Sequence, residues 1–197
     1  SSLSHVGLMI AGIFGSAILS IRIGNPDIFV TEGAEGALVQ TFAHGINVVG
    51  LFYCADILYK RFKTRDIRQM GGLAKVAPKF AVLFMVILLG SMAVPLTNGF
   101  IGEFILLKSV FDYNILMGII SGLTIILCAV YLLRFYGKAM FGEADENVLS
   151  TAKDLSGVEF TVLASLAVFV IMMGIFPQVV IDMVDSSLKF IYSSMVS

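Results

Sequence analysis

Charged side chains are scarce in this sequence of 197 residues, and their scarcity limits what the chain can be. Only 14% of the residues are Asp, Glu, Lys or Arg, whereas 58% are hydrophobic. Soluble domains carry about 25% charged and roughly 45–50% apolar residues. One soluble core cannot bury this much apolar surface, but a lipid bilayer accommodates it. The net charge of −1 offers no basic surface to nucleic acid, which excludes a nucleic-acid partner.

Cysteine is rarer still, with two residues, and the motifs of soluble enzymes are missing. Cys54 and Cys128 lie far apart within apolar stretches. Their spacing excludes a disulfide framework and a zinc site, and we expect both thiols to face lipid or the protein interior. The sequence also lacks a glycine-rich phosphate loop, a metal-ligand spacing and a Ser/His/Asp arrangement. We therefore expect no cofactor and no metal in this chain.

Long apolar stretches are abundant, and five of them predict an all-α integral membrane protein. Such stretches are long enough to cross a hydrocarbon core about 30 Å thick. Pro78 suits the first turn of one helix, and Pro177 ends the last one. The predicted spans are residues 6–23, 34–59, 78–94, 115–133 with an extension to 140, and 160–176.

The basic residues gather in one loop, which predicts the orientation of the chain. Residues 60–79 hold seven Lys or Arg and one acid, Asp66. By the positive-inside rule this loop faces the cytoplasm or its equivalent. Alternation of the spans then puts His5 near the inner side, the linker 142–156 inside, and the chain after Pro177 outside.

The last residues, 178–196, place apolar side chains at near-helical spacing. They predict a short C-terminal amphipathic helix that lies along the membrane surface or against a neighbouring subunit. A frayed end is the alternative.

The third span is predicted to be discontinuous between Pro95 and Gly99. An uncharged apolar run at residues 80–94 leads to Pro95, which removes a backbone donor and clashes with the preceding turn. Asn98 and Gly99 form a turn signal, and a second helical piece follows at residues 100–111. Broken backbone is tolerated at mid-depth only where protein or trapped water satisfies the freed groups.

Glu103 lies within about one turn of this break and is the strongest candidate for a functional residue. A carboxylate inside a membrane costs roughly 3 kcal/mol or more unless it is hydrated, paired or protonated. Because intramembrane ionisable groups are functional by default, we expect Glu103 to take up and release protons. The alternative is that it lies close enough to the outer surface to be solvated.

A polar stripe crosses the second span. Gln40, His44 and Asn47 are spaced i, i+4 and i+7, so they share one helix face. A polar face on an apolar helix is expected to meet a hydrated interior, where the His44 imidazole would relay protons. The alternative is a histidine satisfied within the protein core.

Asp56 and Lys60 are four residues apart near the inner end of the same helix. This spacing predicts that they pair with each other. A point of proton uptake from the inner side is the alternative.

Six segments, in order along the chain, resemble the antiporter-like membrane subunit M (mitochondrial subunit 4) of respiratory complex I. The resemblance covers nearly the whole chain. The segments are SSLSHVG at 1–7, QTFAHG at 40–45, TRDIRQMGGL at 64–73, PLTNGFIGEF at 95–104, YGKAMFG at 136–142 and GIFPQ at 174–178.

The resemblance implies a fold of two inverted five-helix repeats. Residues 1–141 would form most of the second repeat, and residues 142–197 would form the inner linker, the final transmembrane helix and the outer-side tail. Glu103 occupies the family's position beside the break of its twelfth helix, where sister subunits and sodium/proton antiporters usually carry Lys. His5 and His44 fall on the family's histidines of the hydrated central axis.

The beginning of the chain departs from the family pattern. It reads SSLSH, without an initiator Met and without the basic segment of a signal peptide, so we expect a piece of a longer polypeptide. The Lys that precedes this motif in the family is missing, as is the first repeat with its Glu–Lys pair. We therefore do not expect this chain alone to complete a proton path. The loop at residues 21–33 is also longer than expected.

The leading hypothesis is a proton-translocating subunit of NADH–quinone oxidoreductase, with His5, His44 and Glu103 as the proton-transfer residues. It would lie in a bacterial inner (cytoplasmic) membrane, or in the mitochondrial inner membrane if the protein is organellar. Its partners would be the lipid bilayer and other membrane subunits of complex I, including neighbouring antiporter-like subunits. FMN, iron–sulfur clusters and quinone would belong to other subunits. The alternatives are a subunit of a multisubunit Na⁺/H⁺ antiporter or membrane-bound hydrogenase, and a membrane scaffold without transport.

Overall fold

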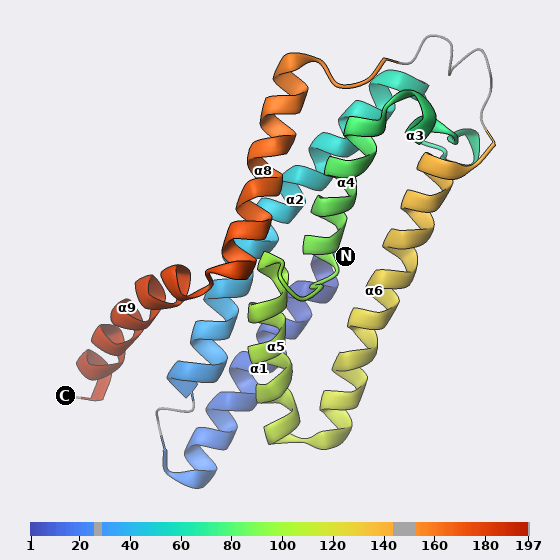
Figure 1. Ribbon diagram of the computed structural model, residues 1–197. Coiled ribbons are helices and arrows are strands. Elements are labelled where there is room, and N and C mark those ends of the chain that lie inside the picture. Colours follow the sequence, from blue (N-terminus) through green and yellow to red (C-terminus); the bar gives the residue numbers. More distant parts are fainter. Residues whose placement is uncertain (26–28, 144–152, 197) are drawn as a thin grey trace.

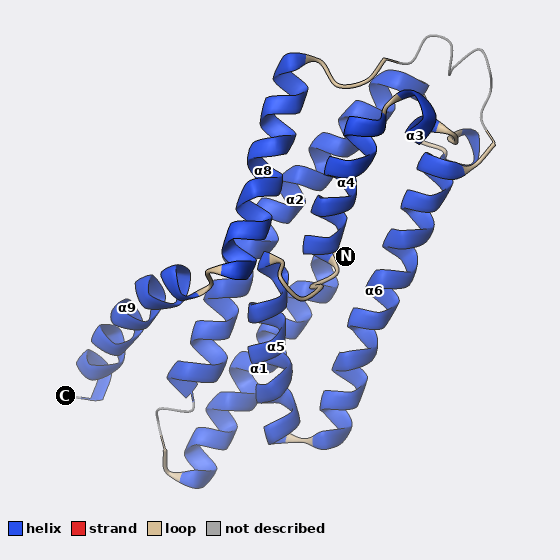
Figure 2. Ribbon diagram, viewed as in Figure 1, coloured by secondary structure: helices blue, strands red, loops and turns tan. Residues whose placement is uncertain are grey.

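A computed structural model describes residues 1–25, 29–143 and 153–196, and every regular element in these ranges is a helix (Figure 2). The prediction of an all-α fold is therefore confirmed. The elements are α1 (Ser2–Ile23), the π-helical turn η1 (Phe29–Ala34), α2 (Glu35–Phe62), the 3-10 turn η2 (Ile67–Gln69), α3 (Leu73–Val76), α4 (Pro78–Ser91), α5 (Asn98–Tyr113), α6 (Ile115–Phe141), α8 (Gly157–Ile175) and α9 (Gln178–Val196).

Four helical segments in the described ranges are long and apolar enough to cross a membrane: α1, the segment Glu32–Phe62 that contains α2, α6 and α8. The remaining predicted span, the third along the chain, is divided. α4 is apolar but has only 14 residues, which is about 21 Å of helix and too short to cross the hydrocarbon core alone. Figure 1 shows α5 continuing from α4 toward the other end of the bundle, so the two half-helices together form the discontinuous span.

The break between α4 and α5 is a compact turn of six residues. Ala93 and Leu96 have φ values of 52° and 73°, a left-handed conformation that costs a non-glycine residue about 1–3 kcal/mol. Pro95 lies between them and is exposed. The turn is supported by α8, because Leu96 packs directly against Gly174, where a side chain would collide with the Leu96 backbone. α4 ends at Ser91 rather than at residue 94, so the break is wider than predicted.

The break between α4 and α5 divides the bundle into two halves along its length. We call the end that carries the basic loop 60–79 the basic end. α4 packs against α2 in the half near the basic end, and α5 packs against α1 and α2 in the other half (Figure 1). α6 runs along both halves, and α8 contacts both half-helices. α9 begins after Pro177 and turns away from the axis of the bundle, so the predicted C-terminal helix forms, and its position on a membrane surface stays a prediction.

Two apolar clusters fill these halves. The larger cluster lies near the basic end and includes Phe80, Phe84 and Leu163. The smaller one is formed by α1, α2 and α5 around Leu8 and Leu106. Along α2 the polar stripe falls between the two clusters. The apolar core is therefore interrupted by a polar layer at the level of the break.

An ion-pair cluster at the basic end fixes the start of α4. Arg61 pairs with Glu159 at 3.0 Å and donates to the backbone carbonyl of Asp154 at 3.2 Å. The Asp154 carboxylate accepts hydrogen bonds from the backbone N–H groups of Lys79 and Phe80, both at 3.2 Å. It thereby caps the first turn of α4, whose N–H groups have no partner within the helix. Residues 144–152 of the predicted linker lie outside the described residues.

The acid of the basic loop is also paired. The Asp66 carboxylate accepts bonds from the Arg68 guanidinium at 2.8 Å and from the Arg68 backbone N–H at 3.0 Å. These bonds hold the pKa of Asp66 at about 2. The carboxylate therefore stays ionised at neutral pH and offsets part of the positive charge of the loop.

Replacing Gly174 by Ala is expected to destabilise the protein, because the new methyl group would meet the Leu96 backbone. Overpacking of this kind costs about 1–3 kcal/mol. Gly122→Ala in α6 is the control, since nothing lies within 4 Å of its new methyl group. Thermal unfolding of the purified protein in detergent should show a lower midpoint for the Gly174 variant alone. Equal midpoints for both variants would contradict the packing described for the break.

Candidate functional site

Glu103 is buried in the second turn of α5, with only 3% of the residue exposed. Its Oε1 atom lies 2.7 Å from His5 Nδ1 of α1 and accepts a 3.0 Å hydrogen bond from Gln40 Nε2 of α2. Three residues that the sequence singled out separately therefore meet at one oxygen atom. The alternative of a solvated Glu103 at the outer surface is wrong.

A glycine permits this meeting. A Cβ atom on Gly102 would lie 2.7 Å from Gln40 Oε1 and 2.8 Å from Gln40 Cα. Because Gly102 has no Cβ, α5 approaches α2 closely enough for the Gln40 amide to reach the neighbouring carboxylate. A glycine at position 102 is therefore required for the contact between Gln40 and Glu103.

The pair of His5 and Glu103 can hold one proton in two ways. With the proton on His5 the pair is an imidazolium and a carboxylate, and with the proton on Glu103 both partners are neutral. Each arrangement keeps the 2.7 Å contact and has a net charge of zero, which limits the cost of burial. Proton transfer across such a distance is within the reach of general acid–base groups.

His5 occupies a different depth from the predicted one. α1 begins about halfway along the bundle (Figure 1), so His5 lies beside the break and not near the inner side. The prediction from alternating spans was wrong because the first helix of this chain does not start at the end of the bundle.

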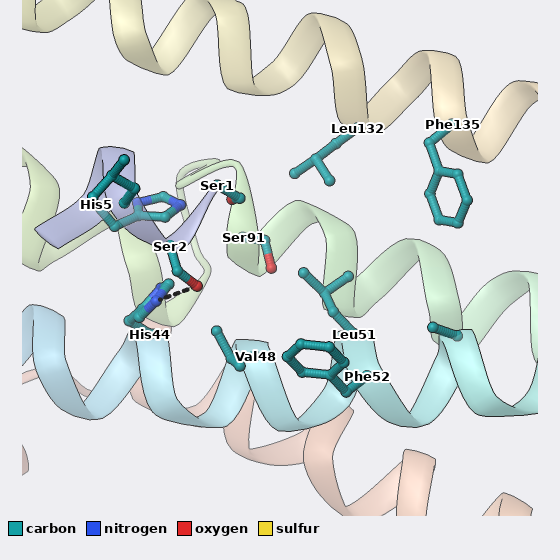
Figure 3. A pocket seen from close by; sticks show the side chains of 12 residues that line it. Ser1, Ser2, His5, His44, Val48, Leu51, Phe52, Ser91, Leu132 and Phe135 are labelled. Atoms are coloured by element: carbon teal, nitrogen blue, oxygen red, sulfur yellow. Dashed lines mark hydrogen bonds between the residues drawn. The ribbon is translucent and has the colours of Figure 1, made fainter. Parts of the chain in front are cut away.

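His44 lies next to His5 but does not contact the carboxylate. The two imidazole rings have their centroids 4.9 Å apart, and His44 Nε2 is 3.2 Å from the Ser2 hydroxyl. Both rings line a pocket of about 490 Å³, together with Ser91 at the end of α4. Figure 3 shows the two histidines at one end of this pocket and the apolar side chains of α2 and α6 at the other.

A second cavity of about 510 Å³ adjoins this pocket toward the basic end. The two share Phe52, Ala55 and Phe135 in their walls, and the second also contains Asp56. Asp56 and Lys60 pair at 2.7 Å, as predicted from their spacing. Their side chains are about half exposed, and a role for them in proton uptake stays a prediction.

The other predicted polar residues hold the break in place. Asn98 is buried in the first turn of α5 and donates from its side-chain nitrogen to the Ala43 carbonyl at 3.2 Å. Asn47 is buried on the same face of α2 as Gln40. Gln40 and Asn47 therefore face the interior of the protein, whereas His44 on the same face is only partly buried. The prediction that this interior is hydrated stays a prediction.

Sequence reasoning missed the polar surroundings of Cys128. The thiol is buried as expected, but it accepts a hydrogen bond from the Tyr131 hydroxyl at 3.1 Å and lies 3.6 Å from the Ser91 carbonyl. It also lines a small cavity together with His5 and Glu103. A cysteine followed three residues later by tyrosine on an apolar helix gives no sequence signal of such a site. Among the residues that the structure describes, no group of three His, Cys, Asp or Glu side chains is arranged to hold a metal ion.

Comparison with known proteins gives the family of the chain. Residues 1–129 match the family described as NADH:quinone oxidoreductase/Mrp antiporter, transmembrane. NADH-quinone oxidoreductase subunit M of Rickettsia typhi is 33% identical over 189 residues, which cover 96% of this chain and 36% of the relative. NADH-ubiquinone oxidoreductase chain 4 of Arabidopsis thaliana has the same identity and the same coverage. The chain thus spans about a third of the length of these relatives.

Solved structures agree with this assignment. Respiratory complex I from Thermus thermophilus contains a similar chain, with a TM-score of 0.79 and 28% identity over 95% of this chain and 37% of that one. The Mrp complex from Dietzia sp. DQ12-45-1b shares the fold at a TM-score of 0.71 and 16% identity, over 94% of this chain and 46% of that one. With its broken helix, its buried glutamate and its match to subunit M relatives over nearly its whole length, the chain belongs to the NADH:quinone oxidoreductase/Mrp antiporter transmembrane family.

Proposed function

We propose that the chain is part of a proton-translocating membrane subunit of NADH–quinone oxidoreductase, with Glu103 as its proton-carrying residue. The observation that carries the proposal is the burial of this carboxylate beside a broken helix, in direct contact with His5 and Gln40. A proton carrier must gain and lose charge within the membrane, and this arrangement supplies a basic partner within 2.7 Å. The names of the subunit M relatives support the same function.

The proton path would run from His44 to His5 and then to Glu103. The pocket of about 490 Å³ that His5 and His44 line is large enough to hold several water molecules, which would link the two histidines. In the next step the N–H bond at His5 Nδ1 breaks and an O–H bond forms at Glu103 Oε1. Each further proton that reaches His5 places a net positive charge on the pair. Release of the Glu103 proton toward the end opposite the basic loop removes that charge.

The remaining parts of the assembly follow from the same proposal. Residues 1–141 would be most of the second antiporter-like repeat, and residues 142–197 would be the linker, the final span and the outer-side tail. The neighbours would be other membrane subunits of complex I, and FMN, iron–sulfur clusters and quinone would be held by other subunits. The membrane would be a bacterial inner membrane or the mitochondrial inner membrane. The energy for transport would come from quinone reduction elsewhere in the complex.

Replacing Glu103 by Gln in the full-length protein is expected to reduce proton pumping at least about tenfold, because the amide cannot carry a proton between its partners. Glu103→Asp should keep part of the activity, since it retains the carboxyl group at a longer distance. The assay is proton uptake into vesicles that contain the assembled complex, driven by NADH and quinone.

Asp112→Asn is the matched control, because Asp112 is an exposed acid of the same helix that pairs with Lys108 at 2.7 Å. It should pump at nearly the rate of the unaltered complex. Normal pumping by an assembled Glu103→Gln complex would leave only the scaffold hypothesis.

The two histidines should differ in importance. His5→Gln is expected to slow pumping more than His44→Gln, because only His5 contacts Glu103. His44 is separated from Glu103 by the His5 ring, so a water molecule can replace it in passing a proton to His5. Comparing initial pumping rates at equal complex content checks this order, and a stronger defect in His44→Gln would contradict the role of His5 as the main proton donor to Glu103.

A Na⁺/H⁺ antiporter subunit is the second candidate, because the fold is shared with the Mrp complex. The two functions separate when NADH oxidation and proton transport are both measured with Na⁺ replaced by choline. Unchanged pumping supports the complex I function. Loss of transport without Na⁺, in an assembly that does not oxidise NADH, would favour the antiporter.

A further inference from the structure

The thiol of Cys128 connects α6 to the pair of His5 and Glu103. It interacts with the His5 side chain, and both residues line a cavity of about 10 Å³ beside Glu103. A cavity of this size is at the lower limit for a single water molecule. Because Cys128 is only 3% exposed, its thiol and the imidazole face each other inside the protein.

The thiol meets the second nitrogen of the His5 ring. Nδ1 lies 2.7 Å from Glu103 Oε1, so the nitrogen left for the thiol is Nε2. In a histidine, the hydrogen bond made by one ring nitrogen sets the protonation of the other. Cys128 is therefore placed where it can control how His5 presents a proton to Glu103.

A thiol can serve Nε2 in both of its protonation states, because it is a weak donor through S–H and a weak acceptor through sulfur. When Nε2 carries a proton, the sulfur accepts it and the S–H group donates to the Ser91 carbonyl, 3.6 Å away. When Nε2 carries no proton, the S–H group can turn from Ser91 to Nε2. The Tyr131 hydroxyl donates to the sulfur at 3.1 Å and holds the thiol in place.

The Ser91 carbonyl is open to this bond because of its position at the break. Ser91 is the last residue of α4, and the last four carbonyls of a helix have no partner within it. The thiol thus links three elements that meet at the proton site: α6, the end of α4, and His5 of α1.

We propose that Cys128 is a positioning residue for proton transfer, whose thiol holds the His5 ring by Nε2 so that Nδ1 stays on Glu103 Oε1. This role rests on the proposed function, because the orientation of His5 affects pumping only if Glu103 receives its proton from that ring. Without the thiol, the ring can turn toward the larger pocket that it shares with His44, and the 2.7 Å contact with Glu103 opens.

The test compares Cys128→Ala with Cys128→Ser in the assembled full-length complex, at equal complex content. Serine keeps a donor and an acceptor on the same Cβ atom, whereas alanine has neither. Cys128→Ala is expected to slow NADH-driven proton pumping roughly two- to tenfold, the range for the loss of one hydrogen bond. Cys128→Ser should restore most of the rate. A purely structural role of the buried side chain would not be rescued by the more polar residue.

Cys54→Ala is the matched control, because Cys54 is fully buried in the larger apolar cluster. It loses the same atom without removing a partner of His5, and it should pump at nearly the unaltered rate. Unaltered pumping by Cys128→Ala, or equal defects in the Ala and Ser variants of Cys128, would overturn the proposal.

Two further measurements separate this role from the proposed function. If Glu103→Gln abolishes pumping while Cys128→Ala does not slow it, only the role of Cys128 fails, whereas normal pumping by Glu103→Gln would overturn the proposed function and this role with it. A cryo-electron microscopy map of the Cys128→Ala complex reports on geometry alone. His5 Nδ1 is expected to lie away from Glu103, and an unmoved ring would overturn the proposal.

Discussion

A carboxylate that is withdrawn from water must find hydrogen-bond donors, and the rest of this structure is arranged around that requirement at Glu103. The donors come from two other helices, His5 of α1 and Gln40 of α2, and both reach the same oxygen. Three helices must therefore keep their relative positions for these contacts to survive. The two apolar clusters above and below the polar layer supply the packing that holds them.

Small residues decide where the helices come close. Gly102 lets α5 approach Gln40, and Gly90 lets the side chains of Asn47 and Asn98 pack closely against α4. At both places a methyl group would collide with a buried polar side chain. The polar layer thus depends on missing side chains as much as on the polar groups themselves, and close packing through small residues is the usual means by which membrane helices associate.

Much of this fold could be predicted from the sequence. Long uncharged runs predicted the spans, and Pro95 with Asn98 and Gly99 predicted the break, because these signals are local. The contact between His5 and Glu103 joins residues far apart in the chain, and no spacing rule predicts it. The depth of His5 was predicted wrongly, since alternating spans assume that each helix starts at a membrane face. Most polar neighbours of Cys128 also escaped prediction because they come from other helices, as the Ser91 carbonyl, His5 and Glu103 do. Tyr131 lies on the same helix, but its spacing from Cys128 gives no signal of a polar site.

The contact of Leu96 with Gly174 has a mechanical consequence. Backbone touches backbone there, without a compliant side chain in between. A shift of α8 along its axis would press on the turn directly, and the turn is already strained at Ala93 and Leu96. α8 is therefore in direct backbone contact with the turn that precedes the acid-bearing half-helix, and any displacement of α8 along its axis must be accommodated by that turn.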